Sequence, residues 1–80
     1  MKNPRTILNK IKWKRNLDFK SAEIWYLHRG AEKDTKIVTG KDILDIGRSF
    51  IKTHSAMIPF HRIFKIIYKD EVIFERDKYR

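Results

Sequence analysis

The amino-acid sequence predicts an α+β fold, with one N-terminal helix packed on a curled, mostly antiparallel sheet, or small open barrel, of about five strands. Three observations lead to this prediction. The chain has 80 residues, so we expect a single domain over residues 1–80. Its hydrophobic residues, 41% of the total, are enough for a compact core. Helical apolar spacing is confined to the N-terminal region, and short β-forming segments with brief polar connections follow, which favours antiparallel pairing.

Residues 4–14 are predicted to form a short amphipathic helix. Either Asn3, which precedes a proline, or Thr6 is a candidate N-cap. Lysines lie off the apolar stripe and are expected to face water. The residues that recur at helical spacing, and that we expect to pack on the sheet, are Ile7, Leu8 and Ile11.

Five later segments are predicted to be strands. Residues 22–29 and 35–39 are separated by the turn GAEKD, so we expect them to form a hairpin with Trp25 in the core. The segment GKDILDIG is expected to begin with one helical turn, and Pro59 is expected to interrupt the strand ladder. The remaining predicted strands are residues 48–53, 62–68 and 72–76, of which the second also fits a helical turn.

The charge of the chain is its strongest global signal. Lys and Arg number 19 against 10 Asp and Glu, which gives a formal net charge of +9. A field of this sign attracts polyanions such as RNA, DNA or an anionic membrane surface, with general basicity as the alternative. From charge and size, we expect a nucleic acid as a partner.

Several classes of protein are excluded by what the sequence lacks. The absence of cysteine rules out disulfides and thiolate chemistry. No apolar run approaches the roughly 18 residues of a transmembrane helix, and the N-terminus lacks the continuous apolar core of a signal peptide. We therefore expect no membrane partner and a cytoplasmic location.

Two His-Arg pairs form the main candidate site and use two of the three histidines. His28-Arg29 ends a predicted strand at Gly30, which permits a sharp turn and offers an unobstructed amide, and His61-Arg62 follows Pro59 at the start of another predicted strand. Arginine matches phosphate oxygens, and histidine exchanges a proton near pH 7. The pairs could therefore clamp a terminal or cyclic phosphate, or act on one as general base and acid without a metal. Alternatively, each His caps a strand end and each Arg is solvated.

Further residues are candidates for contacts with phosphates or bases. Alternation places Tyr26 on the strand face of His28, where it could stack on a base or bond a phosphate, with simple packing as the alternative. Arg48, and Lys10 and Lys12 on the helix, could contact phosphates or could be solvated. We expect no metal site and no cofactor, because the histidines lack a metal-binding spacing.

Several segments, in their order along the chain, resemble a known family: ILNKIKW, EIWYLHRGA, DILDIGRSF, and IPFHRIFKIIY with VIFER. This largely archaeal family is called the RNA cyclic-group end recognition domain, and is also described as a predicted RNA-binding domain associated with poly(A) polymerase. The resemblance covers about residues 7–76. It implies recognition of RNA ends that bear a cyclic phosphate or its processed product. It also implies RNA-processing enzymes as partners, because the family's domain is found joined to RNA-processing domains.

The resemblance also maps two motifs onto this chain. The family's His-Arg-Gly and its Pro-aromatic-His-Arg fall on His28, Arg29 and Gly30, and on Pro59, Phe60, His61 and Arg62. The chain departs from the family pattern in two places. Phe60 stands where the family often has Tyr, which removes a hydroxyl group, and Asp70-Glu71 stands in a turn where the family often has Gly.

These observations favour an RNA-binding module that recognises RNA ends through paired His-Arg motifs on a basic surface. Two alternatives stay open. The chain could be a metal-independent enzyme that processes RNA cyclic phosphates, with His28 and His61 as base and acid. It could instead be an adaptor that docks on an RNA-processing complex.

Overall fold

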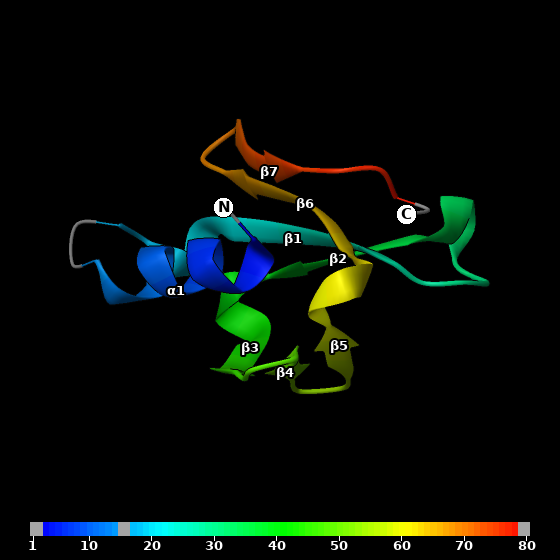
Figure 1. Ribbon diagram of the computed structural model, residues 1–80, viewed down its shortest axis with the longest axis horizontal. Helices are drawn as coiled ribbons and strands as arrows, with labels where there is room; N and C mark the ends of the chain where they lie inside the picture. The colour runs from blue at the N-terminus through cyan, green and yellow to red at the C-terminus, as the bar shows by residue number, and fades with distance from the viewer. Residues whose placement is uncertain (1–2, 15–16, 79–80) are drawn as a thin grey trace.

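A computed structural model describes residues 3–14 and 17–78 and confirms the α+β class (Figure 1). One helix, α1 (Pro4–Trp13), is followed within these ranges by seven strands in two sheets with antiparallel pairing throughout. The four-stranded sheet has the order β2-β1-β6-β7, with bounds Thr35–Thr39, Ala22–Leu27, Ile63–Tyr68 and Glu71–Glu75. The three-stranded sheet has the order β3-β4-β5, with bounds Ile43–Ile46, Phe50–Thr53 and Met57–Pro59.

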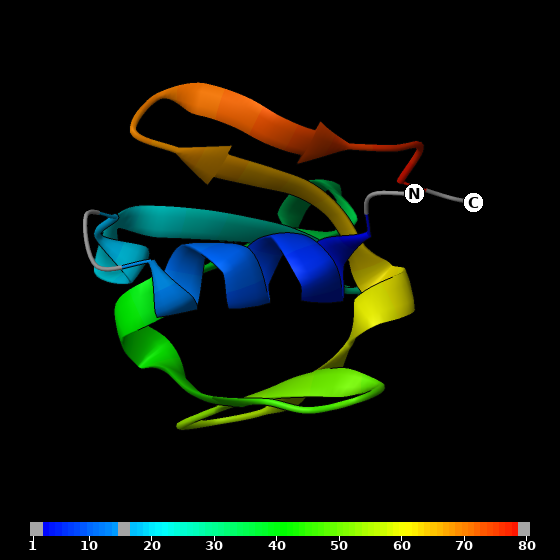
Figure 2. The ribbon, with the colours of Figure 1, turned by 60° about the vertical axis from the view of Figure 1, so that its left-hand side comes forward.

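Helix α1 lies beside both sheets, with the four-stranded sheet above it and the three-stranded sheet below it in Figure 2. The Asn3 side chain accepts a hydrogen bond from the Thr6 backbone N–H at 2.9 Å, so Asn3 rather than Thr6 caps the helix. None of the helices in residues 3–14 and 17–78 combines the length and apolar character needed to cross a bilayer.

The core lies between the helix and the two sheets. The predicted helical stripe is buried there, and each fully buried aliphatic side chain contributes roughly 1.5–3 kcal/mol. Because the cluster draws on the helix and on strands of both sheets, packing in this one core fixes the relative position of all three. Its buried members are Ile7, Leu8, Ile11, Ala22, Ile24, Ile51, Ile58, Ile63 and Ile66.

The strands beyond the predicted five are β3 and β5, which have four and three residues. Strands this short leave too few positions for alternation to be visible in the sequence. The predicted helical turn forms at Gly40–Asp42, directly before β3. Pro59 ends β5 at the edge of its sheet, where a proline is tolerated. Residues 62–68 were also compatible with a helical turn. The structure has a 3₁₀ turn at Phe60–Arg62, and the strand β6 follows it.

Candidate nucleic-acid interface

The two His-Arg motifs lie at the same end of the four-stranded sheet. Strands β1 and β6 are antiparallel neighbours, and Tyr26 near the end of β1 is the Cα partner of Ile63, the first residue of β6. His28-Arg29 follows β1 directly, and His61-Arg62 directly precedes β6. The strand pairing therefore brings together two motifs that are far apart in the sequence.

The first motif is held in a tight turn. The His28 backbone N–H donates to the Asp34 carbonyl at 2.9 Å, and the His28 carbonyl accepts from the Ala31 N–H at 3.2 Å. Gly30 has a φ of 96°, a left-handed conformation that strains other residues. Its N–H donates to the Asp34 carboxylate at 3.3 Å. The expectation of an unobstructed amide is therefore wrong in one respect, because this donor is engaged within the turn.

The second motif lies in the 3₁₀ turn between β5 and β6, where the His61 and Arg62 side chains are exposed. Arg76 fixes both ends of this turn. It donates from Nε to the Ile63 carbonyl at 2.8 Å and from Nη2 to the Phe60 carbonyl at 2.6 Å. Partial burial lowers the pKa of the Arg76 guanidinium from its ordinary value, yet arginine stays a cation in proteins.

Three neighbouring hollows surround the motifs, and we name them the Tyr26, Arg29 and Arg48 hollows. Arg62 lines the Tyr26 and Arg29 hollows, whereas His61 lines the Arg29 and Arg48 hollows. The Tyr26 hollow also contains Tyr26, His28, Lys36 and residues 55–59. The Arg29 hollow also contains Leu27, Arg29 and Lys78. The Arg48 hollow also contains Asn3, Pro4, Arg5, Arg48, Phe60 and Arg76.

These hollows are strongly basic. Among the described residues, no Asp or Glu lines any of the three. A concave surface lined by one sign of charge focuses the electrostatic field and attracts the opposite charge. Charged and neutral N–H and O–H donors at this end are therefore arranged to bind an anion. The seven cationic side chains are those of Arg5, Arg29, Lys36, Arg48, Arg62, Arg76 and Lys78.

Tyr26 contributes a neutral donor to the Tyr26 hollow. Its ring packs edge-on against the His28 ring, with centroids 6.3 Å apart and an angle of 85° between the planes. Desolvation by burial raises the pKa of the Tyr26 phenol, so the hydroxyl group stays protonated at neutral pH. Tyr26 can therefore donate a hydrogen bond to a phosphate oxygen or offer a ring edge to a base.

Comparison with known proteins assigns the chain to a family. Residues 1–76 match the family model described as the MJ1316 RNA cyclic group end recognition domain. The chain belongs to this family. The resemblance indicated by the sequence motifs is thereby confirmed.

Relatives of this MJ1316-family chain occur in archaea. A UPF0248 protein of Archaeoglobus fulgidus is 40% identical over 70 residues, which cover 86% of this chain and 99% of the relative. A UPF0248 protein of Methanococcus maripaludis strain C5 is 41% identical over 63 residues, covering 79% of this chain and 82% of the relative. UPF0248 protein MJ1316 of Methanocaldococcus jannaschii is 31% identical over 74 residues, covering 90% and 91%. No solved structure matches the chain.

In this MJ1316-family chain, the two histidines line different hollows. His28 lies in the Tyr26 hollow, and His61 lies in the other two. Each of the two histidines shares a hollow with Arg62. Each imidazole thus shares its hollow with a permanent cation, a combination suited to holding an anion in place.

Of the other candidates, Arg48 lines one of the three hollows, and the helix lysines are absent from the described lining of all three. Arg48 lines its hollow together with His61 and Arg5 from the first turn of α1. Lys10 and Lys12 lie in the last turn of α1, roughly 8 and 10 Å further along the axis from Arg5 at the usual helical rise. Lys10 lines a separate groove against β7, and Lys12 lies 6.0 Å from the Trp13 ring centroid.

No metal cluster is found in the part of the chain that the structure describes, where no three His, Cys, Asp or Glu side chains are grouped as ligands. His54, the third histidine, is exposed in a bend between β4 and β5. A role in the candidate site is therefore not indicated for His54.

Four cations that line the hollows were not predicted from the sequence. Lys36 had a usable signal, because it is the Cα partner of Tyr26 in the predicted β1-β2 hairpin. Arg5, Arg76 and Lys78 had none, since their place depends on how α1 and the segment after β7 pack near the motifs.

Proposed function

We propose that this chain is an RNA-binding module that holds the terminal phosphate of an RNA, as a 2′,3′-cyclic phosphate or its processed product. The observation that carries the proposal is the position of Arg62. Arg62 lines both the hollow that contains His28 and a hollow that contains His61. The described lining of these two hollows holds no carboxylate. The description of the family as an RNA cyclic group end recognition domain and the net charge of +9 support the same substrate class.

The Arg29 hollow is the best candidate for the phosphate itself. It gathers Arg29, Arg62, His61 and Lys78 around one concave surface. Two planar guanidinium groups can each donate paired hydrogen bonds to phosphate oxygens. A 3′-hydroxyl end offers no such acceptors there, so it leaves the clustered cations without an anion.

Binding of three RNAs of identical sequence tests the proposal. They end in a 2′,3′-cyclic phosphate, a 3′-phosphate or a 3′-hydroxyl, and fluorescence anisotropy measures each Kd. A charge-assisted hydrogen bond contributes about 1.5–3 kcal/mol, so the phosphorylated ends should bind about 10- to 100-fold more tightly than the hydroxyl end. Equal affinity for all three ends would refute end recognition.

Two variants distinguish recognition of the RNA end from nonspecific electrostatic attraction. R62A should bring the ratio of phosphate-end to hydroxyl-end affinity close to one. K12A removes the same charge from the last turn of α1 and should leave that ratio unchanged. The slope of log affinity against log salt should also fall by about 0.7 in R62A, the value for one lost contact with a single strand.

The enzymatic alternative is not favoured by the geometry, because His28 and His61 line different hollows. The same labelled RNAs, incubated without metal and analysed on gels, report any opening of the cyclic phosphate. RNA-processing enzymes as partners, and a cytoplasmic location, stay predictions from the sequence.

A further inference from the structure

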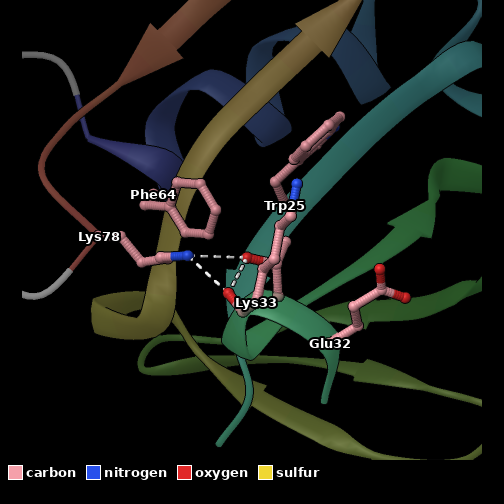
Figure 3. Close-up of a pocket in the computed structure, with 6 residues that line it drawn as sticks. Trp25, Glu32, Lys33, Phe64 and Lys78 are labelled. Atoms are coloured by element: carbon pink, nitrogen blue, oxygen red, sulfur yellow. Dashed lines mark hydrogen bonds between the residues drawn. The ribbon is translucent and has the colours of Figure 1, made fainter.

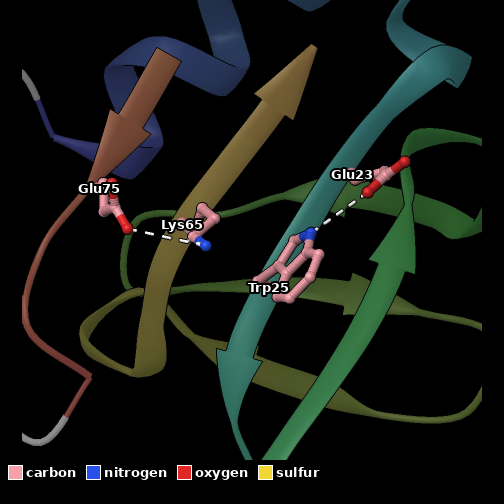
Figure 4. A network of polar contacts seen from close by, with 4 residues as sticks. All are labelled: Glu23, Trp25, Lys65 and Glu75. Atoms are coloured by element: carbon pink, nitrogen blue, oxygen red, sulfur yellow. Dashed lines mark hydrogen bonds and ion pairs between the residues drawn. The ribbon is translucent and has the colours of Figure 1, made fainter. Parts of the chain in front are cut away.

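The outer face of the four-stranded sheet carries a feature that the sequence prediction placed in the core. Trp25 is only partly buried, whereas its neighbour Ile24 is fully buried and faces α1. Strand alternation therefore points Trp25 away from the core. Its indole N–H donates to Glu23 at 3.2 Å, and Lys65 Nζ lies 4.8 Å from the ring centroid (Figure 4).

Trp25 and Phe64 together line a hollow of about 440 Å³ on this face, which is within the range of about 300–1,000 Å³ for ligand sites (Figure 3). Lys78 lies at its rim, with Nζ 5.6 Å from the Phe64 ring centroid and bonded to the Lys33 carbonyl at 2.6 Å. Aromatic rings with lysines around them combine the two features that bind single-stranded nucleic acid. We name this surface the Trp25 hollow.

The Trp25 hollow is continuous with the proposed phosphate site. Lys78 lines both the Trp25 hollow and the Arg29 hollow. Leu27, which lines the Arg29 hollow, lies two residues beyond Trp25 on the same face of β1, roughly 7 Å away at the usual strand rise. An RNA whose last phosphate lies beside Arg29 therefore has its adjoining nucleotides within reach of Trp25.

We propose that the Trp25 hollow is a stacking site for a nucleobase near the RNA end, with Trp25 as the stacking surface, the buried Phe64 ring beside it, and Lys33, Lys65 and Lys78 near its phosphates. This proposal rests on the proposed function. The occupant is a base rather than an apolar peptide because three lysines lie around the two rings. Three carboxylates lie nearby, those of Glu32 in the lining, Glu23 on the indole N–H and Glu75 on Lys65. Lys65, beside the Trp25 ring, also forms an ion pair with Glu75 at 3.6 Å.

Tryptophan fluorescence can report on this contact directly. The chain has two tryptophans, and Trp13 is 77% exposed on α1, so W13F leaves Trp25 as the single reporter. RNA should quench the fluorescence of W13F. RNA with abasic sites in place of its last two bases should bind with much less quenching. Unchanged quenching by the abasic RNA would overturn the proposal.

Substitutions measure the contribution of stacking. W25A should weaken RNA binding about 5- to 100-fold, which corresponds to one lost stacked base, and W25F should retain most of the affinity because it keeps a ring. Circular dichroism and urea unfolding confirm that each variant is folded. Parent-like RNA affinity in folded W25A would overturn the proposal. If that variant also lost self-association in sedimentation, the face would be a protein interface instead.

Failure of this proposal can be told apart from failure of the proposed function. W25A should lower affinity for the phosphate end and the hydroxyl end alike, and so should keep their ratio. If the parent protein shows a ratio of one while W25A still weakens binding, end recognition fails and stacking stands. If the parent protein favours the phosphate end and W25A binds RNA as tightly as the parent, end recognition stands and stacking fails.

Discussion

Arg76 donates from Nη2 to the Phe60 carbonyl at 2.6 Å, a hydrogen bond that spans sixteen residues of the chain. Its Nε donates to the Ile63 carbonyl at 2.8 Å, so one side chain after β7 holds both ends of the turn that carries His61 and Arg62. Arg76 is thus a positioning residue for the candidate site. The last strand serves the site by bringing this guanidinium to the turn.

We predict that R76K weakens RNA binding although the net charge is unchanged. Lysine cannot donate to two separate carbonyls in the fixed geometry of the guanidinium, so one part-buried carbonyl loses its partner at a cost of about 1–3 kcal/mol. Urea unfolding measures that loss, and anisotropy measures the RNA affinity. The Ile63 N–H donates to the Phe60 carbonyl, and its amide exchange should quicken in R76K more than that of a core strand amide such as Ile24, because general destabilisation would quicken both alike.

The control for this variant is R5K, because Arg5 makes an exposed hydrogen bond to the Gly47 carbonyl at 3.1 Å. R5K should change the unfolding free energy by less than about 0.5 kcal/mol. Identical RNA affinity and exchange rates in R76K and the parent protein would remove the positioning role from Arg76.

Gly40 is required by a close approach rather than by its backbone angle. A Cβ atom at Gly40 would lie 1.9 Å from the Phe19 carbonyl oxygen. G40A must displace this backbone, and we expect it to lower the unfolding free energy by about 2–3 kcal/mol. G30A is the contrast, because a Cβ at Gly30 meets no atom within 4 Å and only the φ of 96° is unfavourable. It should cost about 1–2 kcal/mol, and an equal loss in both variants would contradict this explanation.

The turn between β6 and β7 can be stabilised by a single substitution. Lys69 and Asp70 have φ angles of 49° and 67°, the positive values that a tight hairpin turn of this kind needs. D70G should therefore raise the unfolding free energy by about 0.5–1 kcal/mol. D70A, which keeps a Cβ at a positive φ, should not stabilise. Thermal unfolding of both variants tests this, and a gain in D70A would show that charge rather than backbone strain is responsible.

Tyr26 should make stability depend on pH in the alkaline range. Burial raises the pKa of its phenol above the ordinary value of about 10, so the folded state holds the proton more tightly than the unfolded state. This contribution is fully present below pH 10 and is lost as pH rises through the folded pKa. Y26F should show a smaller decrease in unfolding free energy between pH 9 and 11. If the unfolding free energy of Y26F and of the parent protein followed the same dependence on pH, Tyr26 would make no such contribution.

The sequence by itself determined the features that depend on local pattern. The helical spacing of Ile7, Leu8 and Ile11 placed α1 and its buried stripe correctly, because one turn of helix involves only near neighbours. The main strands followed from β-forming residues bounded by turns. The family could also be predicted, because its motifs lie within short continuous segments.

Only the tertiary structure decided which of these segments meet. Strand alternation places Trp25 and Ile24 on opposite faces of β1. Which of these faces is buried depends on where α1 and the three-stranded sheet pack. The prediction of Trp25 in the core was wrong because they cover the face of Ile24. The convergence on Arg62 depends on the long-range register of β1 with β6. No local pattern encodes that register, because it is set by burial of both strands against the same core.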